Sequence, residues 1–300
     1  MATPEDVRIP SHGEQLAAYL YMPEYMPESA QGALPCVVMA HGFSATRDDG
    51  LPLYAEAFRD AGFAVVLFDY RHFGASSGEP RQLLDIGRQH EDYHAAIAWA
   101  RQRQEIDPDR IVLWGSSFSG GHVLAVAADD PGIAAVISQA PFTDAMPALM
   151  HVPLKNAVRL TVAGLLDQLR GWRNRAPLLA AAVGEPGTLA AMTEPDAKPG
   201  FEAIVSPESL WRNEFAARLM LRFPFYRPGL KTPQLTMPLL VCVCENDTTT
   251  PPASTIKAAE RAPRGELRRY PYGHFDIYND PQVKIDQVEF LRRTVAPVTT

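Results

Sequence analysis

The sequence predicts an α/β fold in which a mostly parallel central sheet is covered by helices on both faces. From residue 34 onward, apolar runs of strand length alternate with helix-like runs, which is the order that builds a parallel sheet with helical crossovers. One apolar run ends in a glycine and serine turn that opens directly into a helical pattern. Two later runs end in polar residues, where open α/β sheets place their chemistry.

The expected strands are short apolar runs bounded by turn residues, and the expected helices follow a 3.6-residue period. A short turn at Ser11-His12-Gly13 joins the first strands and predicts an antiparallel edge. The strands are expected at residues 15–21, 36–40, 64–69, 111–114, 134–138, 239–244 and 267–270. The helices outside the middle of the chain are expected at residues 53–61, 88–103, 123–128, 253–262 and 282–295.

Composition fits a catalytic α/β chain. Its 300 residues, 46% of them hydrophobic, are enough for a large core. The formal net charge of −7 argues against a nucleic-acid partner. Residues 1–10 are polar and no apolar run is long enough for a membrane span, so we expect a cytoplasmic protein without a signal peptide. The oligomeric state stays open, a homo-oligomer included.

The three cysteines are expected to fill the core. Cys242 and Cys244 alternate within one strand, so their side chains share a face and do not pair readily with each other. A metal site built on them would need further ligands, and only Cys36 remains, on another strand. We therefore expect no metal at these cysteines. No cofactor is expected either.

A nucleophile elbow is predicted at the turn Gly115-Ser116-Ser117-Phe118-Ser119. A serine at a tight strand-to-helix turn projects its hydroxyl from the sheet edge, and the N–H groups after it can hold an oxyanion. Gly115 lets the chain bend two residues before Ser117, so Ser117 is the expected nucleophile. Ser119, which precedes two glycines, is the alternative register, and a serine cap on an ordinary helix is the non-catalytic alternative.

A serine needs a base that removes its proton and an acid that orients the base. Asp247 follows the expected strand at 239–244, and His274 follows the one at 267–270. The chain order Ser117, Asp247, His274 is the one expected for such a triad on an α/β sheet. Asp144 also follows an expected strand and is the alternative acid.

On these residues the chain resembles the α/β-hydrolase family, specifically esterase-like serine hydrolases of the dienelactone hydrolase and acyl esterase branch. The resemblance covers nearly the whole chain. It implies that Ser117 is the nucleophile, His274 the general base and Asp247 the acid that orients the base.

The resemblance also implies an oxyanion hole. The turn His41-Gly42-Phe43 is similar to the family's His-Gly turn, so the backbone N–H groups of Phe43 and Phe118 are the implied donors. Residues 68–78 resemble the family's loop after the next strand, with His72 where glycine is more frequent. The role of His72 stays open, and Ser119 stands where the elbow motif has its last glycine.

A competing motif is His90-Glu91-Asp92-Tyr93-His94, which fits H-E-x-x-H. On a helix this spacing puts two imidazoles on one face to bind zinc. The residues after it continue an ordinary surface helix, and no third ligand follows. We therefore expect no zinc site here.

Residues 144–236 interrupt the alternation and predict a helical cap, inserted after the sixth strand between two core parts, 1–143 and 237–300. Helices are expected at 154–172, 176–183 and 207–221, the last because Ser206 and Pro207 form a sound helix start. The candidate pocket residues are His41, Trp211, Phe215 and Phe223. The wider apolar set, which could instead form the core of the cap, adds Met146, Leu149, Met150, Leu165, Leu166, Phe225 and Tyr226.

The expected activity is hydrolysis of a carboxylic ester, or a related acyl bond in a small molecule, through an acyl-enzyme intermediate. The same triad would serve a thioesterase, lactonase, acyltransferase or carbon–carbon bond hydrolase, because a scaffold does not fix its reaction. A ligand-binding protein that keeps the triad but turns over slowly is the alternative of another class.

Overall fold

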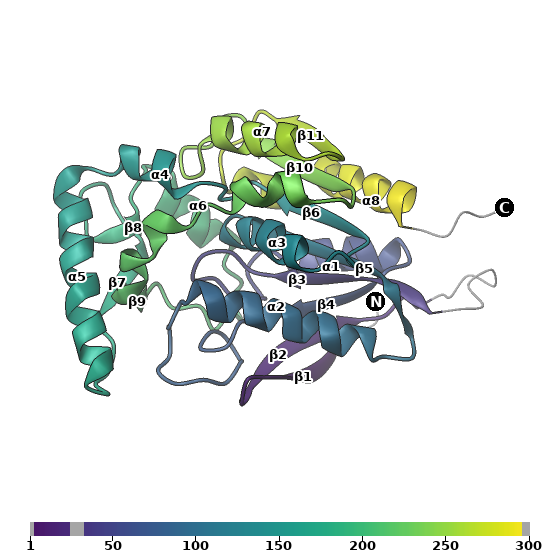
Figure 1. Ribbon diagram of the computed structural model, residues 1–300, viewed down its shortest axis with the longest axis horizontal. Coiled ribbons are helices and arrows are strands. Elements are labelled where there is room, and N and C mark those ends of the chain that lie inside the picture. The colour runs from purple at the N-terminus through teal and green to yellow at the C-terminus, as the bar shows by residue number, and fades with distance from the viewer. Residues whose placement is uncertain (1–2, 25–32, 296–300) are drawn as a thin grey trace.

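The computed structural model describes residues 3–24 and 33–295, and its centre is an eight-stranded sheet (Figure 1). The strand order is β1-β2-β4-β3-β5-β6-β10-β11. β1 and β4 each pair antiparallel with β2, and the remaining pairs are parallel. The strands are β1 (Glu5–Ser11), β2 (Glu14–Tyr21), β3 (Leu34–Ala40), β4 (Ala64–Phe68), β5 (Ile106–Ser116), β6 (Ala135–Gln139), β10 (Leu239–Cys244) and β11 (Gly265–Tyr270). The α/β fold and its antiparallel edge are confirmed.

Helices cover both faces of this sheet. α1 (Pro52–Asp60) and α8 (Pro281–Thr294) lie on one face. α2 (Ile86–Arg101), α3 (Phe118–Asp129) and α7 (Pro252–Arg261) lie on the other. Side chains of a strand alternate between the two faces, so β3 sends Val37 to the cluster around α1 and α8, and Val38 to the cluster around α2 and α3.

The cysteines lie in these cores. All three are buried and free of disulfides. Cys242 and Cys244 pack in the cluster around α1 and α8, whereas Cys36 packs in the other. Burial raises the pKa of the Cys36 and Cys242 thiols to about 12. The expectation that they fill the core is confirmed.

The chain between β6 and β10 forms a separate group of elements at one end of the sheet (Figure 1). It contains helices and a second, three-stranded sheet in the order β8-β7-β9. Its elements are α4 (Ala145–His151), α5 (Leu154–Trp172), β7 (Leu179–Val183), β8 (Ala190–Met192), α6 (Ala197–Ile204), β9 (Phe215–Ala216) and the 3₁₀ helices η1 (Ala217–Leu221), η2 (Phe223–Phe225) and η3 (Pro228–Gln234). One more 3₁₀ helix, η4 (Asp276–Tyr278), precedes α8.

Of the three helices expected in this segment, α5 is confirmed and the other two predictions are wrong. Residues 176–183 favour a helix through their alanines, but β7 pairs with β8 and β9 and is held by Asn213. The Asn213 side chain accepts from the Ala182 and Val183 N–H groups at 3.0 and 2.9 Å. Ser206 makes only a local turn before the chain extends into β9, so residues 207–221 contain a short strand and a 3₁₀ helix. Tertiary pairing overrides local propensity here.

No helix in the described part of the chain combines the length and apolar character that a membrane crossing requires.

Candidate active site

The turn between β5 and α3 is a sharp elbow with Ser117 at its tip. Ser117 has φ 58° and ψ −120°, a left-handed conformation that is rare for a residue with a side chain. Its N–H donates to Gln139 O at 2.9 Å, and its carbonyl accepts from Phe142 N at 2.8 Å, so the end of β6 holds the strained turn. A Cβ atom at Gly115 would lie 2.3 Å from the Ser119 carbonyl oxygen, which explains the glycine two residues before Ser117.

The structure brings the three residues of the expected triad together. His274 Nε2 lies 2.9 Å from Ser117 Oγ, and His274 Nδ1 lies 2.6 Å from Asp247 Oδ2. All three side chains are almost fully buried. They follow β5, β10 and β11 at the same edge of the parallel sheet, as the sequence order predicted.

The Asp247 carboxylate is held by the loop after β10. Its Oδ1 accepts from the Thr249 and Thr250 N–H groups at 2.9 and 2.7 Å, and its Oδ2 accepts from Thr250 Oγ1 at 2.8 Å. These donors fix the carboxylate so that one oxygen faces His274 Nδ1. An imidazole held in this way carries its proton on Nδ1 and leaves Nε2 free to accept from Ser117.

The alternative residues lie elsewhere. Ser119 Oγ is fully buried behind the elbow, 2.7 Å from Tyr93 Oη and 3.1 Å from Tyr70 Oη. Asp144 forms an ion pair with Arg227 at 2.8 Å. The structure brings neither residue to His274.

The implied oxyanion donors flank Ser117. Phe43 follows β3, and Phe118 is the first residue of α3. Their rings meet edge to face with centroids 5.5 Å apart. A Cβ atom at Gly42 would lie 3.1 Å from Ser117 Cβ, so this loop passes close to the serine. Within the described part of the chain, neither the Phe43 nor the Phe118 N–H has a protein acceptor.

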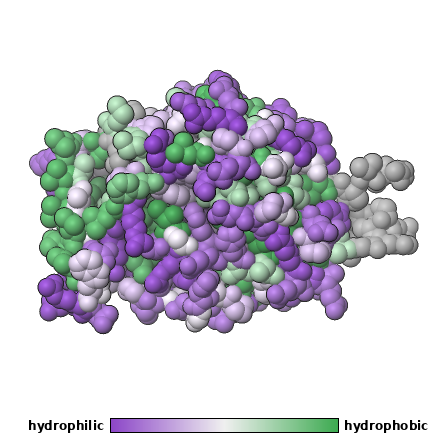
Figure 2. All heavy atoms as spheres, viewed as in Figure 1, coloured by the Kyte–Doolittle hydropathy of each residue, from purple (hydrophilic) through white to green (hydrophobic). Residues whose placement is uncertain are grey.

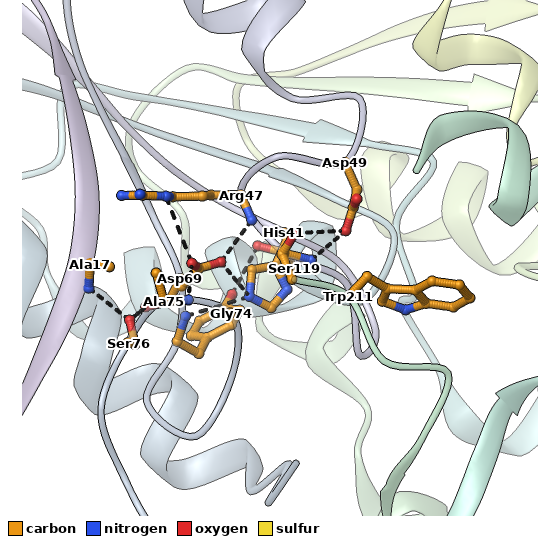
Figure 3. Close-up of polar contacts among 12 residues, drawn as sticks. Ala17, His41, Arg47, Asp49, Asp69, Gly74, Ala75, Ser76, Ser119 and Trp211 are labelled. Atoms are coloured by element: carbon orange, nitrogen blue, oxygen red, sulfur yellow. Dashed lines mark hydrogen bonds and ion pairs between the residues drawn. The ribbon is translucent and has the colours of Figure 1, made fainter. Parts of the chain in front are cut away.

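His41 is buried beneath the candidate triad. It lines neither of the two cavities that Ser117 lines. It is 1% exposed, and its ring packs edge-on against Tyr70 with centroids 4.7 Å apart. Figure 3 shows it between Asp69 and Asp49, with Nε2 3.8 Å from Asp69 Oδ1. Asp69 also accepts from Arg47 N at 2.7 Å. Burial lowers the pKa of His41 to about 4 and raises that of Asp69 to about 6.

His72 shapes its loop. It has φ 74°, and its Nε2 lies 3.0 Å from Arg88 Nη1. Burial first, and then the Arg88 charge, lower the pKa of His72 to about 4. A Cβ atom at Gly78 would lie 2.7 Å from His72 Nδ1, so the loop closes tightly around this ring.

The first imidazole of the H-E-x-x-H match, His90, contacts residues outside its own helix, and none of these contacts is with the second imidazole of the motif, His94. His90 Nε2 lies 3.1 Å from His122 Nδ1 and 3.3 Å from Tyr226 Oη. His122 Nδ1 lies 2.6 Å from the same hydroxyl. Among the described residues, no group of three or more His, Cys, Asp or Glu side chains is arranged to hold a metal ion.

Two cavities meet at Ser117. We name them the first and the second cavity, with volumes of about 20 and 70 Å³. Ser117, Phe43 and Met192 line both. The first cavity also reaches His274, and its apolar wall includes Phe201 and Ile204. The apolar wall of the second consists of Phe118, Phe142, Val152, Ala191 and Phe223.

Each cavity is lined by a carboxyl residue, one oxygen of which has no hydrogen-bond partner among the described residues. Asp49 Oδ1 belongs to the first cavity, and Glu194 Oε2 to the second. Burial raises the pKa of both carboxyl groups. Thr249, whose hydroxyl also lacks a partner, lies beside Glu194 in the second cavity. Buried polar atoms without partners are costly, so water or a bound molecule would have to satisfy these atoms.

Of the candidate pocket residues, the structure places Phe223 in the second cavity and leaves the others outside both. Phe215 is fully buried in β9 and packs edge-on against Phe43 at 5.0 Å. Trp211 stacks on Phe201 at 4.8 Å, one layer behind the first cavity.

The wider apolar set is mostly on the surface. Met150, Leu165, Leu166 and Phe225 are exposed. Tyr226 is buried against Phe118. The Leu149 side chain lies outside the described residues. Sequence reasoning missed Met192, Glu194 and Asp49, because no motif marks them and only the fold brings them to Ser117.

Comparison with known proteins agrees with this geometry. Residues 12–171 match the X-Pro dipeptidyl-peptidase (S15) family. The chain belongs to the S15 family of α/β hydrolases. Among its relatives is the quorum-quenching protein AidA of Acinetobacter baumannii, 42% identical over 295 residues, which are 97% of this chain and 95% of AidA. The thiohydrolase aneE of Aspergillus aculeatus is 36% identical over 177 residues, 58% of this chain and 54% of aneE.

Solved structures of other proteins share the fold of this chain. The α/β hydrolase GrgF of Penicillium superposes with a TM-score of 0.83 at 24% identity, covering 99% of this chain and 100% of GrgF. Est1E of Butyrivibrio proteoclasticus, solved with ferulic acid, superposes with a TM-score of 0.67 at 19% identity, covering 97% of this chain and 100% of Est1E. At these identities the likeness concerns the fold alone.

Proposed function

We propose that this hydrolase cleaves a carboxylic ester, or a related acyl bond, by serine nucleophilic catalysis. The observation that carries the proposal is the pair of contacts that His274 makes, 2.9 Å to Ser117 Oγ and 2.6 Å to Asp247 Oδ2. A serine hydroxyl, an imidazole and a carboxylate in this order are the parts that acyl transfer to serine requires. The strained backbone of Ser117 supports this role, because strain of this kind gathers at active sites.

The proposed mechanism has two halves. Ser117 Oγ attacks the substrate carbonyl carbon while His274 Nε2 takes the hydroxyl proton, and the Phe43 and Phe118 N–H groups donate to the oxyanion. The tetrahedral intermediate collapses, His274 returns the proton to the leaving group, and the acyl group stays on Ser117. Water then attacks the acyl carbon while His274 Nε2 takes its proton. Collapse of this second tetrahedral intermediate releases the acid, and His274 returns the proton to Ser117 Oγ. Asp247 keeps the imidazole oriented and stabilises its charged form.

The two cavities can hold the two groups that the scissile bond joins, which are the acyl group and the leaving group. Both open at Ser117, so the acyl group can occupy one and the leaving group the other. We propose residues 144–236 as a cap over the site. The second cavity is lined by Val152, Met192 and Phe223 of this segment, and the first by its Phe201 and Ile204. The mainly apolar walls favour a small, mainly apolar substrate.

The names of the relatives widen the set of acyl bonds to test. AidA is named a quorum-quenching protein and aneE a thiohydrolase, and relatives such as ATR5 of Stachybotrys chlorohalonatus are named polyketide transferases. The family description adds peptide bonds after proline. Transfer to a second acceptor in place of water would use the same serine and the cavity vacated by the leaving group.

A substrate panel under multiple-turnover conditions tests the proposal. The panel contains p-nitrophenyl esters of increasing chain length, a thioester, a lactone and an X-Pro p-nitroanilide, each with and without a hydroxylated acceptor. We expect repeated turnover on at least one oxygen ester. Binding with no more than one turnover per chain would favour the receptor-like alternative. The cytoplasmic location is a further part of the proposal, supported by three buried cysteines without a disulfide.

A further inference from the structure

The outer face of α5 carries a continuous apolar stripe. Seven of its side chains are apolar and between 41 and 80% exposed. Their spacing of three and four residues places them on one side of the helix. They are Leu154, Val158, Val162, Leu165, Leu166, Leu169 and Trp172. Figure 2 shows the hydrophobic atoms gathered at the left of the view, where Figure 1 places α5.

A row of cations borders this stripe. At 100° per residue, Lys155, Arg159, Arg170 and Arg173 lie along one edge of the stripe. All four are exposed, and in the described part of the chain none of them belongs to an ion pair. The acidic residue of α5, Asp167, is buried and binds Arg218 at 2.7 Å. The exposed face of α5 is therefore positively charged on a chain whose formal net charge is −7.

An anionic lipid surface complements this face. Apolar side chains bordered by Lys and Arg are the pattern of helices that lie in a membrane interface. The cations then meet lipid phosphates while the apolar stripe enters the acyl boundary. Trp172, which is 74% exposed at the end of the helix, has the amphipathic ring that is enriched at this depth.

A second copy of the chain fits this face less well. A helix of 19 residues is about 28 Å long and offers a strip of about 280 Å², whereas a stable interface buries about 800 Å² per partner. Antiparallel pairing of α5 with its copy would also place one row of cations against the other. Both arguments favour a partner that is extended and negatively charged.

The position of the stripe relates it to the candidate active site. Val152, in the connection between α4 and α5, lines the second cavity. A lipid surface against α5 would therefore lie beside the cavity that contains Ser117. We propose that the apolar stripe and cationic row of α5 dock this protein on anionic membranes. The proposal concerns binding and does not depend on the proposed function.

Vesicle flotation tests the proposal with the full chain. One vesicle preparation contains phosphatidylcholine alone, and the other contains phosphatidylcholine mixed with phosphatidylglycerol. We expect the protein to float with the anionic vesicles at low salt, and less at high salt. The double variant Leu165→Gln/Leu169→Gln removes apolar area, and Arg159→Gln/Arg173→Gln removes two cations. We expect each to weaken binding to the anionic vesicles roughly tenfold or more.

The matched control is Lys257→Gln/Arg261→Gln, which removes two exposed cations from α7 and should bind as the native chain does. Absence of native binding to anionic vesicles would overturn the proposal. An equal loss in the α7 control would also overturn it, because α5 would then have no special part. Light scattering on the same variants detects the other occupant. A native dimer that the α5 apolar variant makes monomeric, without vesicle binding, would assign the stripe to a second copy and overturn the proposal.

Discussion

His274 Nε2 lies 2.9 Å from Ser117 Oγ, although 157 positions separate the two residues in the chain. Ser117 follows β5 and His274 follows β11, and both strands end at the same edge of the sheet. The residues between them build the strands from β6 to β11, Asp247 and most of the wall of the second cavity. Substitutions at these positions therefore distinguish effects on the catalytic step from effects on the packing around the site.

Replacement of Ser117 by alanine should abolish turnover. If the three residues act as one unit, as they do in subtilisin, the loss in kcat is roughly six orders of magnitude. Ser119→Ala is the control. It removes a hydroxyl that contacts Tyr70 and Tyr93, so it should lower stability by about 1–3 kcal/mol and keep most activity. Rates on a p-nitrophenyl ester and thermal unfolding measure both variants. Activity in Ser117→Ala together with a dead, folded Ser119→Ala would reverse the two roles.

The acid is tested by Asp247→Asn. The amide would present the wrong partner to His274 Nδ1 and favour the wrong tautomer, with a loss of roughly 10⁴ in kcat by analogy with serine proteases. Asp144→Asn is the matched control, because this carboxylate pairs with Arg227 and not with His274. Its kcat should stay near that of the native protein. A silent Asp247→Asn with a crippled Asp144→Asn would place the acid after β6.

Stability should fall as the pH falls from about 6.5 to about 4. Burial lowers the pKa of His41, His72 and His90 from 6.5 to about 4, so in this window the unfolded chain binds protons that the folded chain does not. Each of these groups contributes a slope of up to about 1.4 kcal/mol per pH unit. Asp69, whose pKa burial raises from 3.8 to about 6, opposes them below pH 6 and reduces the net slope.

Urea unfolding at a series of pH values measures this slope. The His90→Gln variant should show a shallower decline than the native chain, because one buried imidazole is removed. A free energy of unfolding that is constant, or that rises, as the pH falls through this window would contradict the assignment of neutral buried histidines.

Selectivity should respond to Phe223 more than to Trp211. Phe223 lines the second cavity, so Phe223→Ala enlarges it and should shift the ratio of kcat/KM between long and short acyl chains by about 1–3 kcal/mol. Trp211 stacks on Phe201 behind the first cavity, so Trp211→Ala should mainly lower stability. An unchanged ester profile in a folded Phe223→Ala variant would exclude the second cavity as a binding site.

The sheet and the elbow could be predicted because residues that are close together in the sequence determine each of them. The apolar runs give the strands, and Gly115 before Ser117 gives the tight turn. Asp247 and His274 could be proposed because each directly follows a strand. The distances that join these two side chains to each other and to Ser117 could not be predicted from the sequence, because strand register and loop length decide whether two strand ends meet.

The segment after β6 was harder to predict because its elements depend on distant partners. The alanines of β7 favour a helix in isolation, but Asn213 and β9 bind their backbone as a strand. From the sequence alone, the apolar residues of this segment also do not indicate whether their side chains face the site or the solvent. Leu165 and Leu166 face outward on α5, while Met192 faces Ser117. Apolar composition alone does not distinguish a pocket wall from a docking surface.

The most direct test of the account is the site of covalent labelling by a fluorophosphonate, combined with turnover of the same preparation. We predict stoichiometric labelling of Ser117, as located by peptide mass spectrometry. We also predict loss of ester turnover in proportion to labelling, and no labelling in His274→Ala. Full ester turnover after complete labelling of Ser117, or labelling elsewhere with loss of activity while Ser117 stays free, would contradict it.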